Sequence, residues 1–83
     1  MTPLDIRVAA AQQANAIREY SRFLNGVRMP YSNYNKSVMN YWKSRLSRNG
    51  RRIVNAAKNI GLHSNKFRTN TPEYYSHLIN LAR

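Results

Sequence analysis

Residues 51–68 read RRIVNAAKNIGLHSNKFR, and this segment decides how the rest of the chain is expected to fold. Ile53, Ala57 and Ile60 recur at intervals of four and three residues, which predicts a helix with one apolar face. Gly61 can adopt the left-handed conformation that ends a helix. The segment therefore predicts a short helix, a glycine turn and the beginning of a second short helix.

The same spacing resembles a helix-turn-helix motif over residues 53–68. Ala57 stands where that motif has a small residue at the helix crossing, and Gly61 matches its turn glycine. Three inward apolar positions match as well, at Ile60, Leu62 and Phe67. The resemblance implies that the second helix reads base edges in the major groove through Ser64, Asn65, Arg68 and Thr69. It implies phosphate contacts from Arg51, Arg52 and Lys66. A plain helical hairpin is the alternative interpretation.

The region before this segment predicts two longer helices. Residues 2–24 carry an apolar stripe at helical spacing, and Thr2 with Asp5 three residues later resembles a capping box. A second helix is expected from residues 32–33 to about residue 48, where Asn49 and Gly50 form a stop signal. The third helix would then begin at residue 51.

A last helix is expected after Thr71, which can cap it, with Pro72 in its first turn and Glu73 near its positive end. The chain lacks sustained alternation of apolar and polar residues, so strands are not expected. We therefore predict an all-α fold, a small bundle of four or five helices linked by short turns, in a single domain spanning residues 1–83.

Several aromatic residues lie near lysines, as in surfaces that stack unpaired bases. Tyr34, Tyr41 and Trp42 also fit the apolar stripe of the second helix, and core packing is the favoured interpretation for Tyr41 and Trp42. Tyr31, beside Pro30, is the aromatic residue expected to be exposed.

Charge is the strongest functional indication. The chain of 83 residues has 14 Lys and Arg against 3 Asp and Glu, a formal net charge of +11. Self-repulsion at this level opposes folding unless an anionic partner offsets it. The densest cluster consists of Arg45, Arg48, Arg51 and Arg52, which repel one another in the absence of an anion. Solvated basic faces without a ligand are the alternative.

An enzyme is not expected. The chain has no cysteine, its carboxylates are scattered, and it has no glycine-rich phosphate loop, so neither a cofactor nor a metal site is predicted. Glu73 and His77 are four residues apart, which more often gives a surface pair than half of a metal site. No apolar run is long enough to span a bilayer. We expect a soluble protein of the cytoplasm or nucleoid, or one inside a virus particle.

These observations predict a small basic nucleic-acid-binding protein, with DNA expected in preference to RNA, that contacts phosphates through residues 45–68. The predicted binding residues are Arg45, Arg48, Arg51, Arg52, Ser64, Asn65, Lys66 and Arg68. If about 6 phosphates were neutralised on a duplex, the log–log salt slope would be near −5. The alternatives are a structural subunit of a virion or ribonucleoprotein particle, and an inhibitor that binds an acidic protein surface.

Overall fold

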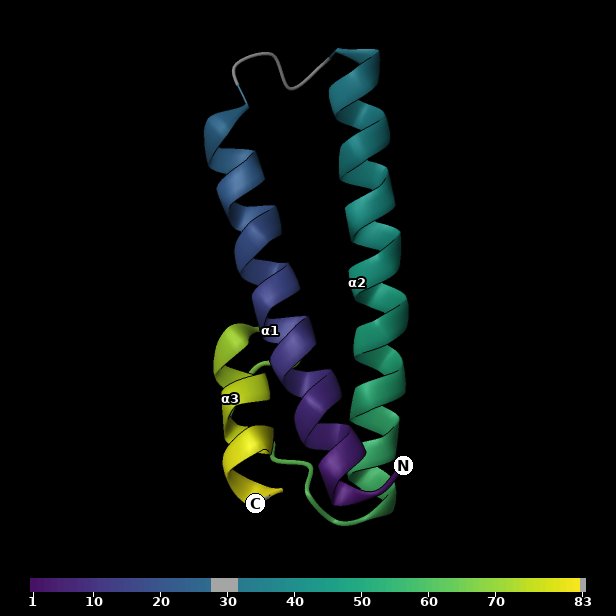
Figure 1. Ribbon diagram of the computed structural model, residues 1–83, viewed down its shortest axis with the longest axis vertical. Coiled ribbons are helices and arrows are strands. Elements are labelled where there is room, and N and C mark those ends of the chain that lie inside the picture. The colour runs from purple at the N-terminus through teal and green to yellow at the C-terminus, as the bar shows by residue number, and fades with distance from the viewer. Residues whose placement is uncertain (28–31, 83) are drawn as a thin grey trace.

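The computed structural model describes residues 1–27 and 32–82, which form three α-helices: α1 (Pro3–Gly26), α2 (Asn33–Asn59) and α3 (Pro72–Leu81). The long helices α1 and α2 lie side by side and antiparallel along the long axis (Figure 1). The shorter α3 lies beside the half of α1 that contains the N-terminus, and α1 packs against both other helices. The other half of the molecule is a two-helix arm (Figure 1).

Each helix begins at a hydroxyl cap. The Thr2 hydroxyl accepts a hydrogen bond from the Asp5 backbone N–H at 3.2 Å, and the Asp5 carboxylate accepts one from the Thr2 N–H at 3.0 Å. The hydrogen bond from the Thr2 backbone lowers the pKa of the Asp5 carboxyl. The Ser32 hydroxyl caps α2 by accepting from the Asn35 N–H, and the Thr71 hydroxyl caps α3 by accepting from the Tyr74 N–H. The predicted starts of these helices are confirmed.

The core lies where all three helices meet. Two of its buried members on α1 are alanines, which let α1 approach its neighbours closely, and two on α3 are tyrosines. They are Ile6, Ala10, Ala14, Ile53, Ala57, Tyr74, Tyr75 and Leu78. Leu62 and Phe67, from the segment between α2 and α3, pack against this cluster. The core therefore stabilises the half of the molecule that contains α3, and the arm lies outside it.

The predicted bundle of four or five helices is wrong, because the described residues contain three. The stop expected at Asn49 and Gly50 does not occur, and α2 continues through both residues to Asn59. Leu46, Gly50, Ile53 and Ala57 are all buried on one face, so the apolar face of the first half of α2 continues into the second half. A glycine inside a helix costs about 1 kcal/mol, which tertiary packing can offset.

A buried polar cluster explains why glycine occupies position 50. Gln13 Nε2 donates to the Leu46 carbonyl at 2.8 Å and to Asn70 Oδ1 at 3.0 Å, and the Tyr75 hydroxyl donates to Asn70 Oδ1 at 3.2 Å. A Cβ on Gly50 would lie 2.7 Å from Asn70 Oδ1 and 2.8 Å from the Tyr75 hydroxyl oxygen. The cluster joins all three helices, and only glycine leaves room for it.

The end of α2 agrees with the prediction for Gly61. This residue has a φ of +77°, the Gly61 N–H donates to the Lys58 carbonyl at 3.3 Å, and the Leu62 N–H donates to the Ala57 carbonyl at 2.9 Å. These two bonds form a Schellman motif. The glycine turn of the sequence analysis is therefore confirmed.

The short helix predicted after this turn is wrong, since residues 62–71 contain no helix. Local hydrogen bonds replace the helical ones. The Ser64 hydroxyl accepts from the Lys66 N–H at 3.2 Å, and the Thr71 hydroxyl donates to the Arg68 carbonyl at 2.7 Å. Asn70 has a φ of +61°, a conformation that interrupts a helix. The segment is thus a loop that leads into α3.

Residues 28–31, which contain the predicted connector and Tyr31, lie outside the described residues. No helix in the described part of the chain is both long and apolar enough to cross a membrane.

Candidate nucleic-acid interface

Two tyrosines and three arginines form a line along the exposed face of α2. They are Tyr34, Tyr41, Arg45, Arg48 and Arg52, at successive intervals of seven, four, three and four residues. This spacing keeps side chains on one face of a helix, and all five are exposed. We call this set the arginine–tyrosine stripe. It runs beside the buried face of α2, since Arg45 and Arg52 line a groove together with Gln13 and Ala16 of α1. At about 1.5 Å per residue it is about 27 Å long.

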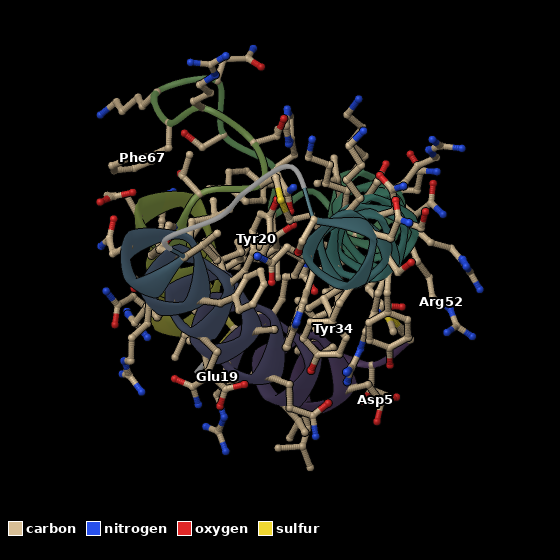
Figure 2. The ribbon with its side chains drawn as sticks, turned by 90° about the horizontal axis from the view of Figure 1, so that it is seen from above. Asp5, Glu19, Tyr20, Tyr34, Arg52 and Phe67 are labelled. Atoms are coloured by element: carbon tan, nitrogen blue, oxygen red, sulfur yellow. The ribbon has the colours of Figure 1, made fainter. Side chains whose placement is uncertain are left out.

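Among the described residues, no carboxylate forms an ion pair with an arginine of the stripe. In the described part of the chain, Arg48 and Arg52 make no hydrogen bond or ion pair, and neither does the neighbouring Arg51. Figure 2 shows Arg52 projecting from α2, away from the loop that carries Phe67. Guanidinium groups in this position are free to form paired hydrogen bonds with phosphate oxygens.

Arg45 is held in place by an aromatic cluster that crosses from α2 to α1. Its guanidinium carbon lies 5.6 Å from the centre of the Trp42 ring, within the range of a cation–π contact. Trp42 stacks on Tyr20 of α1 with ring centres 6.3 Å apart, and it meets Tyr41 edge to face at 6.1 Å. The ring of Trp42 therefore supports Arg45 and Tyr41 from the bundle side.

Two of these aromatic residues are exposed although the sequence predicted that they would be buried. Tyr41 was expected to pack in the core and Tyr34 to join the apolar side of α2, yet they are 60% and 75% exposed. Trp42, for which core packing was also expected, is half-buried against Tyr20 of α1 and lies outside the core cluster. Both tyrosines lie on the exposed side of α2, whereas Trp42 lies toward α1, where it stacks on Tyr20.

The remaining predicted binding residues lie on other parts of the surface. Arg51 shares a shallow groove with Thr69 and Asn70 of the loop, so it is the α2 arginine nearest to that segment. Lys66 and Arg68 are exposed on the loop itself. Arg52 and Phe67 lie on opposite sides of the view along the long axis (Figure 2). Two basic surfaces therefore exist, the stripe and the loop, with Arg51 between them.

Ser64 and Asn65 have local partners. The Ser64 hydroxyl accepts from the Lys66 backbone, and Asn65 Oδ1 lies 3.1 Å from His63 Nε2. His63 Nδ1 lies 2.9 Å from the Tyr74 hydroxyl, so this histidine links the loop to α3. The base-reading roles predicted for Ser64 and Asn65 remain a prediction, and their side chains are presented by a loop instead of a helix.

The titratable groups of the core serve packing. Burial raises the pKa of the Tyr74 hydroxyl, and burial together with the neighbouring Tyr74 raises the pKa of Tyr75 to about 12. Within residues 1–27 and 32–82, no three His, Cys, Asp or Glu side chains gather where they could hold a metal ion. Glu73 and His77 share a helix, and the His77 ring lies 4.9 Å from that of Phe67.

Comparisons with protein-family models, with curated proteins and with solved structures gave no match. The arginine–tyrosine stripe therefore rests on the geometry of this chain alone. Sequence reasoning found its arginines and missed that the tyrosines continue their line. The spacing of seven, four, three and four residues was visible, but only a helix that runs through Gly50 places all five on one face.

Proposed function

We propose that this protein binds nucleic acid, with DNA preferred to RNA, through the arginine-rich surface of residues 45–68. The observation that carries the proposal is the line of exposed arginines on α2, which have neither a carboxylate nor a hydrogen-bond partner among residues 1–27 and 32–82. Arg45, Arg48 and Arg52 lie within two turns of one helix face. Their mutual repulsion is relieved when an anion with several charges binds along the line.

A nucleic-acid backbone suits this arrangement because it presents a row of negative charges. Arginine forms two parallel hydrogen bonds with a phosphate group, and three arginines in a row can contact successive phosphates. Arg51, Lys66 and Arg68 add charge on the adjoining groove and loop. In this proposal the stripe makes the central contacts, and the loop residues, Ser64 and Asn65 among them, make peripheral ones.

A triple substitution of the stripe tests the proposal. Arg45→Gln, Arg48→Gln and Arg52→Gln together should weaken DNA binding and reduce the salt slope by about 2–3, since each lost phosphate contact contributes about 0.7 to 0.9. Fluorescence anisotropy with labelled DNA across a salt series measures both quantities. Circular dichroism should show that the variant is folded, because the three side chains are exposed.

The matched control removes the same charge elsewhere. Arg18→Gln, Arg22→Gln and Lys36→Gln change three exposed cations outside residues 45–68. If binding depends on net charge alone, both triple variants lose the same affinity and the same slope, and the proposed surface is wrong. If only the stripe variant loses slope, the surface is supported.

A structural subunit of a larger assembly is the second candidate. It is favoured by exposed apolar side chains on the outer face of α1, where Leu4 and Val8 face solvent, together with the exposed tyrosines of the arm. Failure of the isolated chain to bind DNA at near-physiological salt would favour this candidate over the first.

A further inference from the structure

We infer that the arginine–tyrosine stripe is built for an unpaired nucleic-acid strand, whose bases stack on Tyr34 and Tyr41 while its phosphates follow Arg45, Arg48 and Arg52. The inference rests on the proposed function and narrows it from nucleic acid in general to single strands. Four observations carry it: the exposure of the tyrosines, their alignment with the arginines, the support behind Tyr41, and the loop that replaces a helix at residues 62–71.

The exposure of the tyrosines is large for side chains of this size. Tyr34 is 75% exposed and Tyr41 is 60% exposed, although both stand on a well-formed helix beside a neighbouring helix. Placing aromatic surface in water is unfavourable, at about 25 cal/mol for each Å² left uncovered. A flat ligand that covers the rings removes this cost, and a nucleobase is such a ligand because every base has a π-face.

The alignment connects stacking to phosphate binding. Tyr34 and Tyr41 are separated by about 10 Å along the helix axis, close to the length of three stacked nucleotides at about 3.4 Å each. Arg45 follows Tyr41 after one turn, and Arg48 and Arg52 continue the same line. A strand that follows the stripe therefore meets rings first and guanidinium groups next, without leaving the face of α2.

Trp42 makes this arrangement rigid. It stacks on Tyr20 of α1, meets Tyr41 edge to face, and lies beneath Arg45 at 5.6 Å. Because the ring and the guanidinium share one support, less side-chain freedom is lost when a ligand binds both. It is also the only tryptophan in the chain, so its emission reports directly on this part of the stripe.

A duplex uses these groups less well. Its bases are covered by their neighbours in the stack, so the two tyrosines would gain no stacking from it, and only the arginines would find partners. Residues 62–71 form a loop, so the helix that would enter a major groove in a helix-turn-helix is missing from this segment. The described surface therefore suits stacking on the faces of unpaired bases better than hydrogen bonding to base edges in a duplex groove.

The test compares a labelled DNA single strand of about 12 nucleotides with the corresponding duplex, using the full chain. Tyr34→Ala with Tyr41→Ala should weaken single-strand binding by about fivefold for each ring, which is about 1 kcal/mol per base and the lower limit for stacking. Duplex binding should change less than about twofold, because no stacking is lost there. Tyr34→Phe with Tyr41→Phe is the matched control, which keeps both rings and should retain single-strand affinity. Trp42 emission should change on binding of the single strand to the wild type.

The outcomes separate this inference from the function it rests on. A selective loss for the single strand in the alanine variant, restored by phenylalanine, supports stacking. Equal losses on strand and duplex, or a phenylalanine variant as weak as the alanine variant, overturn the inference while DNA binding by the arginines stands. A wild-type chain that binds neither ligand at near-physiological salt overturns both and favours the structural subunit of a larger assembly.

Discussion

Replacing Gly50 by alanine separates two physical effects of opposite sign. In an ordinary helix interior, alanine is more stable than glycine by about 1 kcal/mol, because it loses less backbone entropy on folding. Gly50 lies in the interior of α2, yet a Cβ at this position would be 2.7 Å from Asn70 Oδ1 and 2.8 Å from the Tyr75 hydroxyl oxygen. Both distances are too short, so the substitution must move atoms of the buried cluster.

The size of the effect follows from the hydrogen bonds at risk. Asn70 Oδ1 accepts from Gln13 Nε2 at 3.0 Å and from the Tyr75 hydroxyl at 3.2 Å. Losing both bonds costs about 2 kcal/mol, and a donor left buried without a partner costs about 1–3 kcal/mol. After the gain of about 1 kcal/mol in helix propensity is subtracted, we expect Gly50→Ala to lower the free energy of unfolding by about 1–4 kcal/mol.

Thermal and urea unfolding followed by circular dichroism measure this change. For a domain of this size, about 1 kcal/mol shifts Tm by about 4–8 °C, so Tm should fall by at least about 4 °C. Gly26→Ala is the control, because a Cβ there has no atom within 4 Å, and it should change Tm little. A Gly50→Ala variant with unchanged or higher Tm would show that Gly50 is only a tolerated helix glycine and that the polar cluster does not require it.

Two further predictions concern the turn and the core. Gly61→Val should lower the free energy of unfolding by about 1–2 kcal/mol, because a β-branched residue resists the left-handed conformation, whereas Gly61→Asn should cost less. A Cβ there meets no atom within 4 Å, so equal stability of the three proteins in urea would remove the conformational argument. Folding raises the pKa of Tyr75 to about 12, so as pH rises above about 10 the Tyr75 hydroxyl ionises in the unfolded chain before it does in the folded one. The free energy of unfolding should therefore fall by about 1.4 kcal/mol per pH unit between about pH 10 and 12. Tyr75→Phe should make urea unfolding less sensitive to pH in that range. The same pH profile in the wild type and in Tyr75→Phe would contradict the raised pKa of Tyr75.

Local chemistry made the helix starts predictable. The hydroxyls of Thr2, Ser32 and Thr71 accept hydrogen bonds from backbone groups only three residues away, so the sequence near each start is sufficient. Gly61 was predictable for the same reason, since the Schellman motif involves neighbouring residues.

The course of α2 through Gly50 was not predictable in this way. The pair Asn49–Gly50 has the composition of a helix end, and the groups that keep it helical, Asn70, Tyr75 and Gln13, are distant in sequence. Local propensity is a weak guide where tertiary contacts of this kind decide. The wrong helix end predicted at Gly50 divided α2 into two helices, and the short helix predicted after Gly61 accounts for the rest of the excess in the predicted helix count.

The candidate site was predictable in its charges and not in its shape. Arg45, Arg48 and Arg52 were recognised from composition, because clustered cations are visible in any conformation. The exposure of Tyr34 and Tyr41 and the partial burial of Trp42 depend on which side of α2 meets α1, and no local pattern reveals this. An apolar stripe on a helix is buried only if another element reaches it.

The buried cluster and the arginine–tyrosine stripe lie on different faces of α2, and the cluster secures the geometry of the stripe. Had the helix ended at Gly50, Arg52 would begin a new helix with its own direction, and its line with Tyr34 and Tyr41 would be lost. Because Asn70 and Tyr75 lie against the bare backbone of Gly50, the helix continues without a break, and a rise of about 1.5 Å per residue carries the line from Tyr34 to Arg52. The glycine that looked like the end of a helix is thus the residue that allows a single helix to present rings and guanidinium groups in one row.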